Sequence, residues 1–189
     1  MKILVVGAIG KIGAALTEAF EARHEVLRAS PTRSALKVDL GDPESIKRLY
    51  AKVGRVDAVV CAAGQAAFGP LLALTDADFA LSLSNKLMGQ VNLVRFGVEG
   101  VADGGSFTLI SGMLSRRPMP GGAAISLANA GLEGFVRAAA LELPRGVRIN
   151  VVAPSPVREP LPAAVAQTYI QAVEGRITGQ VLDVAANSG

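Results

Sequence analysis

The sequence has few of the residues that often carry chemistry or cross-link a fold. Its 189 residues include one cysteine, one histidine and no tryptophan, and aromatic residues make up 4% of the total. The single cysteine, Cys61, excludes an internal disulfide and fits a reducing compartment, with a buried thiol as the ordinary state. With so few aromatic residues, the core must consist of alanine, valine, leucine and isoleucine, which is typical of parallel strands buried between helices.

Charge and hydropathy exclude further classes of protein. The formal net charge is +3, and the lysines and arginines are scattered, whereas a nucleic-acid-binding face needs them clustered. No apolar run approaches the roughly 20 residues of a membrane span, and no cleavable signal is visible. We therefore expect one domain, residues 1–189, in a cytoplasmic protein that binds neither nucleic acid nor membrane, and we expect no metal site.

The chain is organised around a glycine-rich stretch near its start. The apolar run 3–6 is followed by Gly7, Gly10 and Gly13 in the spacing G-x-x-G-x-x-G, and a helix is expected to follow. Glycines in such a strand-to-helix turn give freedom of φ, close approach of a ligand and close packing of the helix. The free amides at the positive end of the helix dipole favour a pyrophosphate. The stretch predicts a nucleotide pocket; a purely structural turn is the alternative.

The end of the second predicted strand, 24–29, bears on the choice of cofactor. Dinucleotide-binding domains that prefer NAD place a carboxylate there for the ribose 2′-hydroxyl, whereas a basic residue accommodates a 2′-phosphate. Here the residues are Ala29-Ser30-Pro31-Thr32-Arg33, without a carboxylate. The pattern favours NADP over NAD through Arg33, unless Arg33 is a solvated loop charge.

The rest of the chain alternates predicted strands with predicted helices. Such alternation indicates an α/β fold, a Rossmann-like, doubly wound parallel sheet of about seven strands with helices on both faces. The further strands are expected at 35–40, 56–61, 106–110, 147–152 and 179–184, and the helices at 10–23, 42–52, 75–101, 123–143 and 162–174.

These landmarks together resemble the short-chain dehydrogenase/reductase family over nearly the whole chain. The resemblance lies in the glycine turn, shorter by one inserted residue, and in a series of motifs that occur in the family's order. These are Asp39 at the adenine position, Cys61-Ala62-Ala63-Gly64 for the N-N-A-G loop, Ile110-Ser111-Gly112 at the serine strand end, Leu132-Glu133-Gly134-Phe135 in the catalytic helix, and Val147-Arg148-Ile149-Asn150 with Ala153-Pro154 at the sixth strand.

The resemblance implies an NADP(H)-dependent oxidoreductase that acts on a small carbonyl or alcohol. It also implies a homodimer or homotetramer formed by the long helices that precede and follow the fifth strand. The cofactor-binding residues that it implies are Gly7, Ile9, Gly10, Lys11, Ile12, Gly13, Ser30, Arg33, Asp39, Leu40, Ala62, Ala63, Gly64, Ser111, Asn129, Pro154 and Val157.

The catalytic positions depart from the family pattern. Members normally carry Tyr-x-x-x-Lys, in which the tyrosine transfers the proton and the lysine lowers its pKa. Here Ile125 and Asn129 stand at those two positions, and the family's serine falls at Gly112 or, with a slip of one residue, at Ser111.

The family's asparagine is ambiguous as well. Residue identity selects Asn85, whereas its spacing to Gly89 selects Lys86.

Two hypotheses follow from this departure. In the first, the protein is an oxidoreductase in which Ser111 holds the carbonyl oxygen and Lys86 supplies charge or a proton, with Asn85 as a further catalytic candidate. In the second, it binds NADP(H) without hydride transfer and acts as a cofactor sensor or oligomer partner. Arg116 and Arg117 either select an acidic substrate or are solvated, and the segment 154–162 is shorter than the family's substrate lid.

Overall fold

The computed structural model describes residues 1–155 and 162–184. Within this part of the chain, seven parallel strands form one sheet in the order β3-β2-β1-β4-β5-β6-β7. The strands are β1 (Lys2–Val6), β2 (Glu25–Ser30), β3 (Leu36–Lys37), β4 (Val56–Cys61), β5 (Val101–Ile110), β6 (Arg148–Pro154) and β7 (Val181–Val184). The predicted sheet is confirmed.

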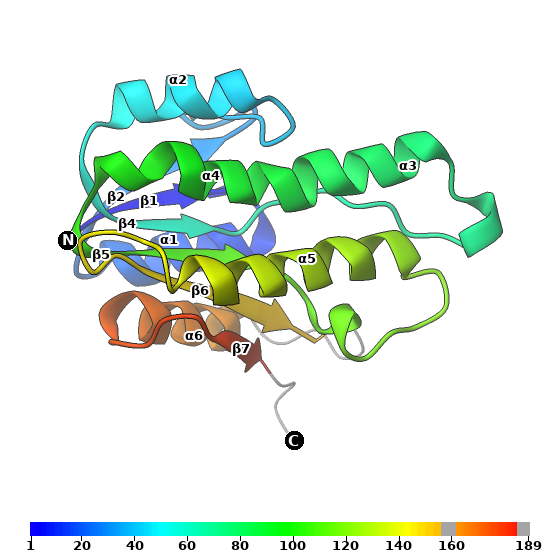
Figure 1. Cartoon of the computed structure of the whole chain (residues 1–189). Coiled ribbons are helices and arrows are strands. Elements are labelled where there is room, and N and C mark those ends of the chain that lie inside the picture. The colour runs from blue at the N-terminus through cyan, green and yellow to red at the C-terminus, as the bar shows by residue number, and fades with distance from the viewer. Residues whose placement is uncertain (156–161, 185–189) are drawn as a thin grey trace.

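Helices cover both faces of the sheet, as Figure 1 shows. The α-helices are α1 (Lys11–Glu21), α2 (Pro43–Val53), α3 (Asp76–Leu81), α4 (Gly89–Gly97), α5 (Ala123–Ala139) and α6 (Pro162–Glu174). Shorter helices are η1 (Leu71–Ala73), the π-helix η2 (Ser82–Met88), η3 (Val98–Gly100) and η4 (Met113–Ser115). In the described residues, no helix has the length and apolarity needed to cross a membrane.

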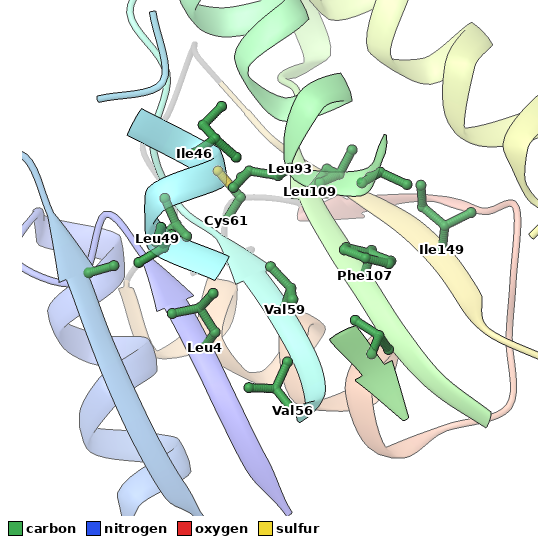
Figure 2. Packing of buried hydrophobic residues seen from close by; sticks show 14 of the residues in the cluster. Leu4, Ile46, Leu49, Val56, Val59, Cys61, Leu93, Phe107, Leu109 and Ile149 are labelled. Atoms are coloured by element: carbon green, nitrogen blue, oxygen red, sulfur yellow. The ribbon is translucent and has the colours of Figure 1, made fainter. Parts of the chain in front are cut away.

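Two hydrophobic clusters hold these layers together, one on each face of the sheet. Alternate residues of β1 supply both, because successive side chains of a strand point to opposite faces. Leu4 belongs to a cluster that contains residues of α2 and α4 (Figure 2) and of α5, while Ile3 belongs to a cluster that contains residues of α1 and α6. The central strands are therefore buried on both faces, as their uninterrupted apolar sequences predict.

The strand order places a ligand crevice at the carboxyl end of β1. Strand β1 pairs with β2 on one side and with β4 on the other, so the chain reverses its direction of winding there. In open α/β sheets, ligands bind outside the carboxyl ends of the strands at such a switch point. The glycine turn follows Val6 directly at this point.

Several predicted elements differ in extent from those observed. The third strand is limited to residues 36–37, so Asp39 and Leu40 lie in the loop after it. The single helix expected over 75–101 is divided into α3, η2 and α4, and its middle turn is a π-helix. Strand β5 begins at Val101, because Gly104 adopts a positive φ of 70° within the strand and does not end it.

Candidate active site

The glycine turn is shaped by contacts that leave no space for side chains. Gly7 has a φ of +87°, and a β-carbon on it would lie 2.7 Å from the β-carbon of Ala63. A β-carbon on Gly13 would overlap the carbonyl oxygen of Gly7. A β-carbon on Gly10 would instead make an ordinary contact, 3.5 Å from the Gly7 carbonyl oxygen. Gly10 caps α1, and no side chain of the described residues caps this end of the helix. The start of α1, at the positive end of the helix dipole, therefore suits an anion.

A cavity of about 220 Å³ lies beside this turn. The loops after β1, β2, β3 and β4 all contribute to its walls. Its lining consists of Val6, Gly7, Pro31, Val38, Asp39, Leu40, Ala63, Gly64, Gln65 and Asn85. One oxygen of the Asp39 carboxylate accepts the Gly41 amide at 2.8 Å, which fixes this side chain at the cavity wall.

The two candidates for the family's asparagine occupy different places. Asn85 lines the cavity, and its amide oxygen accepts the Gln65 backbone N–H at 2.8 Å. Lys86 instead lies buried beside the end of β5. The structure therefore brings Lys86 to Ser111, and it does not bring Asn85 there.

Ser30 and Arg33 also occupy separate environments. The buried Ser30 hydroxyl accepts the Ser34 N–H at 3.0 Å, so it stabilises the loop after β2. The exposed Arg33 borders a second, open cavity together with Ile9 and Arg28. Arg28 is paired with Glu21 through hydrogen bonds of 2.5 to 2.9 Å.

The remaining predicted cofactor residues lie along the same edge of the sheet. Lys11 and Ile12 begin α1, with Ile12 packed against the cluster between α1 and α6. Ala62 donates its backbone N–H to Val6, and Pro154 ends β6. Val157 lies outside the described residues.

Lys86 is a buried cation with few acceptors. Its side-chain nitrogen lies 3.5 Å from the backbone carbonyl oxygen of Ser111, and the residue is 6% exposed. Burial disfavours the ammonium form and lowers the pKa of Lys86 to about 8. Lys86 belongs to the π-helix η2, and π-helical turns often occur at functional sites.

Asn129 presents a buried amide to the same place. It is 1% exposed, and neither its amide nitrogen nor its amide oxygen has a hydrogen-bond partner among the described residues. The amide nitrogen lies 3.0 Å from the position that a β-carbon on Gly112 would take. Because an unsatisfied buried amide is costly, this side chain fits a site that a polar ligand completes.

A buried carboxylate, Glu133 of α5, lies behind Ser111. It accepts a hydrogen bond from the Ser115 hydroxyl at 2.6 Å and a longer one, 3.4 Å, from the Ser111 hydroxyl. Arg116 contacts the second oxygen of Glu133 at 3.3 Å and binds Asp183 of β7 through two bonds of 2.5 and 2.9 Å. The hydrogen bonds to Asp183 raise the pKa of Arg116, so this guanidinium is firmly charged and already paired.

Glu133, Ser115 and Gln90 belong to this site, although the sequence motifs did not indicate them. A signal for Glu133 was present, since Ile125, Asn129 and Glu133 are spaced by four residues and share one face of α5. Gln90 carried no comparable signal, because its partners are backbone groups of Lys86 and of β5.

A parallel sheet with a glycine turn at its switch point and a cavity beside it defines a Rossmann-type dinucleotide-binding protein. More particularly, the chain belongs to the short-chain dehydrogenase/reductase family, as the sequence motifs predicted: residues 11–184 match the family described as enoyl-(acyl carrier protein) reductase. Proteins of this family bind nicotinamide dinucleotides.

Curated relatives include the uncharacterized NAD-dependent oxidoreductase MT0715 of Mycobacterium tuberculosis, which is 30% identical over 71% of this chain and 53% of its own length. Versicolorin reductase 1 of Aspergillus parasiticus is 29% identical over 89% of this chain and 67% of its own length. The chain thus spans from about half to two thirds of the length of these relatives.

Solved structures match over nearly the full chain. The protein lin1944 from Listeria innocua has 39% identity and a TM-score of 0.95, with 98% of this chain and 100% of that chain covered. A small-chain dehydrogenase in complex with NADPH has 25% identity and a TM-score of 0.90, with 97% of this chain and 96% of that chain covered.

Proposed function

We propose that this protein is an NADP(H)-dependent oxidoreductase that acts on a small, uncharged carbonyl or alcohol. The observation that carries the proposal is the buried Lys86 ammonium beside Ser111, at the edge of the sheet that also holds the glycine turn. Bound cofactor supplies the hydride, and the chain supplies binding, orientation and the proton.

The residues of the crevice fit a nicotinamide dinucleotide. The uncapped start of α1 at Gly10 suits the pyrophosphate, and the cavity at Asp39 suits the adenosine. The orphaned amide of Asn129, far along the same edge, suits the polar groups of the nicotinamide half. We assign Asn85 to the cofactor cavity, since it lies among the residues that line it.

The preference for NADP rests on the loop after β2. This loop has no carboxylate, and Arg33 lies exposed on it; the Lys37 ammonium binds the carbonyl oxygen of Thr32. Two cations therefore lie on or beside the loop at which we expect a 2′-phosphate to distinguish NADP from NAD. The related structure in complex with NADPH supports this preference, whereas the mycobacterial relative is named as NAD-dependent.

Lys86 and Ser111 divide the acid–base work in this proposal. A lysine with a pKa near 8 exchanges protons close to neutral pH, which suits a general acid. Ser115 satisfies the Glu133 carboxylate at 2.6 Å, so the more weakly held Ser111 hydroxyl can turn and donate to a carbonyl oxygen. Lys86 thus supplies the proton, and Ser111 polarises the carbonyl.

The pairing of Arg116 favours an uncharged substrate. Its guanidinium is engaged by Glu133 and by Asp183, so it offers little to a substrate carboxylate. An acidic substrate would have to displace these partners.

A second function, cofactor binding without hydride transfer, is favoured by one observation. Ile125, at the position of the family's tyrosine, has no proton to give. A cofactor sensor or oligomer partner would need the glycine turn and the cavity but not the Lys86–Ser111 pair.

One experiment tests the proposal and separates the two functions. Calorimetry measures the binding of NADPH and of NADH to the purified protein. Turnover of a panel of aldehydes, ketones and quinones is then followed through the absorbance of the reduced cofactor. We expect NADPH to bind more tightly and to be consumed with an uncharged carbonyl. Tight binding without consumption across the panel favours the second function, and absence of binding contradicts both.

We also propose that the protein forms a homodimer or homotetramer through α4, α5 and the helical turns that precede α4. Leu81, Met88 and Leu127 expose large apolar side chains on these elements. Light scattering should show an assembled species that Met88→Asp or Leu127→Asp converts to monomer, because a buried charge opposes association. A monomer at every concentration of the unmodified protein would contradict this proposal.

A further inference from the structure

The side chain of Gln90 joins the two elements that carry Lys86 and Ser111. Gln90 is the second residue of α4 and is fully buried. Its amide nitrogen donates to the carbonyl oxygen of Lys86 at 3.0 Å and to that of Ile110 at 2.9 Å, and its amide oxygen accepts the Ile110 N–H at 2.9 Å. A single side chain therefore fixes the turn that bears Lys86 to the residue before Ser111.

The need for this side chain follows from the sheet. Strand β4 pairs with β5 only as far as Val60 and Thr108, so β5 continues past the last β4 pair. The two backbone polar groups of Ile110 would lack partners there, and a buried unpaired backbone group is costly. Gln90 supplies both a donor and an acceptor where β4 no longer pairs with β5.

The other partner of the Gln90 side chain, the carbonyl oxygen of Lys86, lies on an unusual turn. Lys86 is part of the π-helix η2, whose i→i+5 pattern loosens the ordinary ladder of helical hydrogen bonds. The bond from Gln90 to the Lys86 carbonyl oxygen holds this turn at a set distance from β5.

We propose that Gln90 is a positioning residue that holds Lys86 against Ser111, so that the Lys86 ammonium stays out of water and the two groups face the same reacting centre. The catalytic part of this inference rests on the proposed function, whereas the positioning part is a property of the free protein.

The test uses the full chain without cofactor, labelled with ¹⁵N and with ¹³Cε-lysine. We expect the Lys86 signal, assigned by its loss in Lys86→Met, to titrate near pH 8. In Gln90→Met, which keeps the size of the side chain and removes all three bonds, we expect the midpoint to rise by about one pH unit or more, because water reaches the ammonium. We also expect the Ile110 amide to exchange at least about tenfold faster, since it loses its acceptor. A folded Gln90→Met with an unchanged midpoint and unchanged Ile110 exchange overturns the proposal.

Three further variants separate positioning from general loss of stability. Gln90→Asn is the substitute if Gln90→Met does not fold, because its side chain stays polar but is too short to reach both elements. It should likewise raise the Lys86 midpoint and speed the exchange of the Ile110 amide. Asn150→Leu removes a comparable buried amide, which bonds Ile177 and Gln180, and should lower stability while the Lys86 midpoint stays in place. Leu87→Ala weakens packing next to Lys86 and should also leave the midpoint within about 0.3 unit. If either control moves the midpoint as far as Gln90→Met does, the effect is general and the proposal fails.

Activity provides a separate readout. With a substrate in hand, Gln90→Met should lower kcat at least tenfold and leave the Kd for NADPH within twofold, because Gln90 lies outside the cofactor cavity. An unmodified protein that binds NADPH and reduces nothing contradicts the proposed function, but the midpoint and exchange measurements still decide the role of Gln90.

Discussion

The side-chain nitrogen of Lys86 lies 3.5 Å from the backbone carbonyl oxygen of Ser111, in a place that water scarcely reaches. The titratable group that acts on Lys86 from β4 is the Cys61 thiol, and burial raises its pKa to about 12, so it stays neutral near pH 8. Lys86 therefore carries its charge without a carboxylate partner among the groups that shift its pKa, so burial of this charge destabilises the fold. In the proposed reaction the same burial favours release of the proton.

The cost of burying the Lys86 ammonium predicts a stabilising substitution. The folded-state pKa of Lys86, about 8, lies below its ordinary value of 10.5, so below pH 8 both states are protonated and the cost of burial is fully present. Between these two values the unfolded state binds more protons, and the free energy of unfolding rises with pH. Lys86→Met should raise the free energy of unfolding at pH 7 by about 1 to 3 kcal/mol and abolish turnover.

Urea unfolding at pH 7 and pH 10 measures the difference in the free energy of unfolding between Lys86→Met and the unmodified protein. The advantage of Lys86→Met should shrink at the higher pH. If Lys86→Met is less stable than the unmodified protein at pH 7, the ammonium has a partner whose stabilisation exceeds the free-energy cost of its desolvation.

The two serines near Glu133 should behave differently. Ser111→Ala should lower kcat about 100-fold at an unchanged Kd for NADPH, because it removes a donor to the carbonyl oxygen. Ser115→Ala removes the 2.6 Å bond to the buried Glu133 and should lower the free energy of unfolding by about 1 to 3 kcal/mol, with a smaller change in kcat. Steady-state kinetics and urea unfolding on Ser111→Ala and Ser115→Ala measure these effects. Equal losses of kcat in the two variants would contradict the separate roles of the two serines.

Arg33 should set the preference between the two cofactors. Arg33→Ala should weaken NADPH binding about tenfold and leave NADH binding unchanged, since the guanidinium is expected to meet the 2′-phosphate. Arg117, another exposed arginine, lies on the loop after β5, and Arg117→Ala provides the matched control. Calorimetry with both cofactors measures the affinities of the two variants and of the unmodified protein. Equal weakening of NADPH and NADH binding by Arg33→Ala would show that Arg33 does not contact the 2′-phosphate.

Two glycines of the turn should separate folding from binding. Gly13→Ala would place a methyl group on the Gly7 carbonyl oxygen and should lower the free energy of unfolding by about 3 kcal/mol or more. Gly10→Ala has room in the free protein, its nearest contact being 3.5 Å, and should leave stability within about 1 kcal/mol while weakening cofactor binding. Thermal unfolding with and without NADPH distinguishes the two; a stable Gly13→Ala would contradict the packing role.

The sheet and the family could be predicted because their signals are local and repeated. The apolar run of β1 and that of β4 each indicate a strand buried on both faces, and the glycine turn marks the switch point between them. The extent of β5 could not be predicted, since Gly104 has the appearance of a terminator in sequence and is accommodated within the strand.

The choice between Asn85 and Lys86 shows why the site was harder to predict. The two residues are neighbours in a π-helical turn, and the sequence does not show that Lys86 faces the end of β5 whereas Asn85 faces the cavity. Gln90 was missed for a different reason. Its partners are backbone groups of a strand about 20 residues later, and only the observed packing brings them together.

The hydroxyl of Tyr169, on α6, donates a 2.7 Å hydrogen bond to the carbonyl oxygen of Cys61, 108 positions earlier in the chain. The ring is fully buried in the cluster that joins α1 and α6 to the sheet, so the strand that leads into the Ala62-Ala63-Gly64 loop is supported by a helix that follows it at a long distance in the sequence. During synthesis on the ribosome, the end of β4 therefore lacks this support until the residues of α6 have been made. Contacts between residues so far apart in the sequence form slowly, so this edge of the crevice is completed only when α6 docks on the sheet.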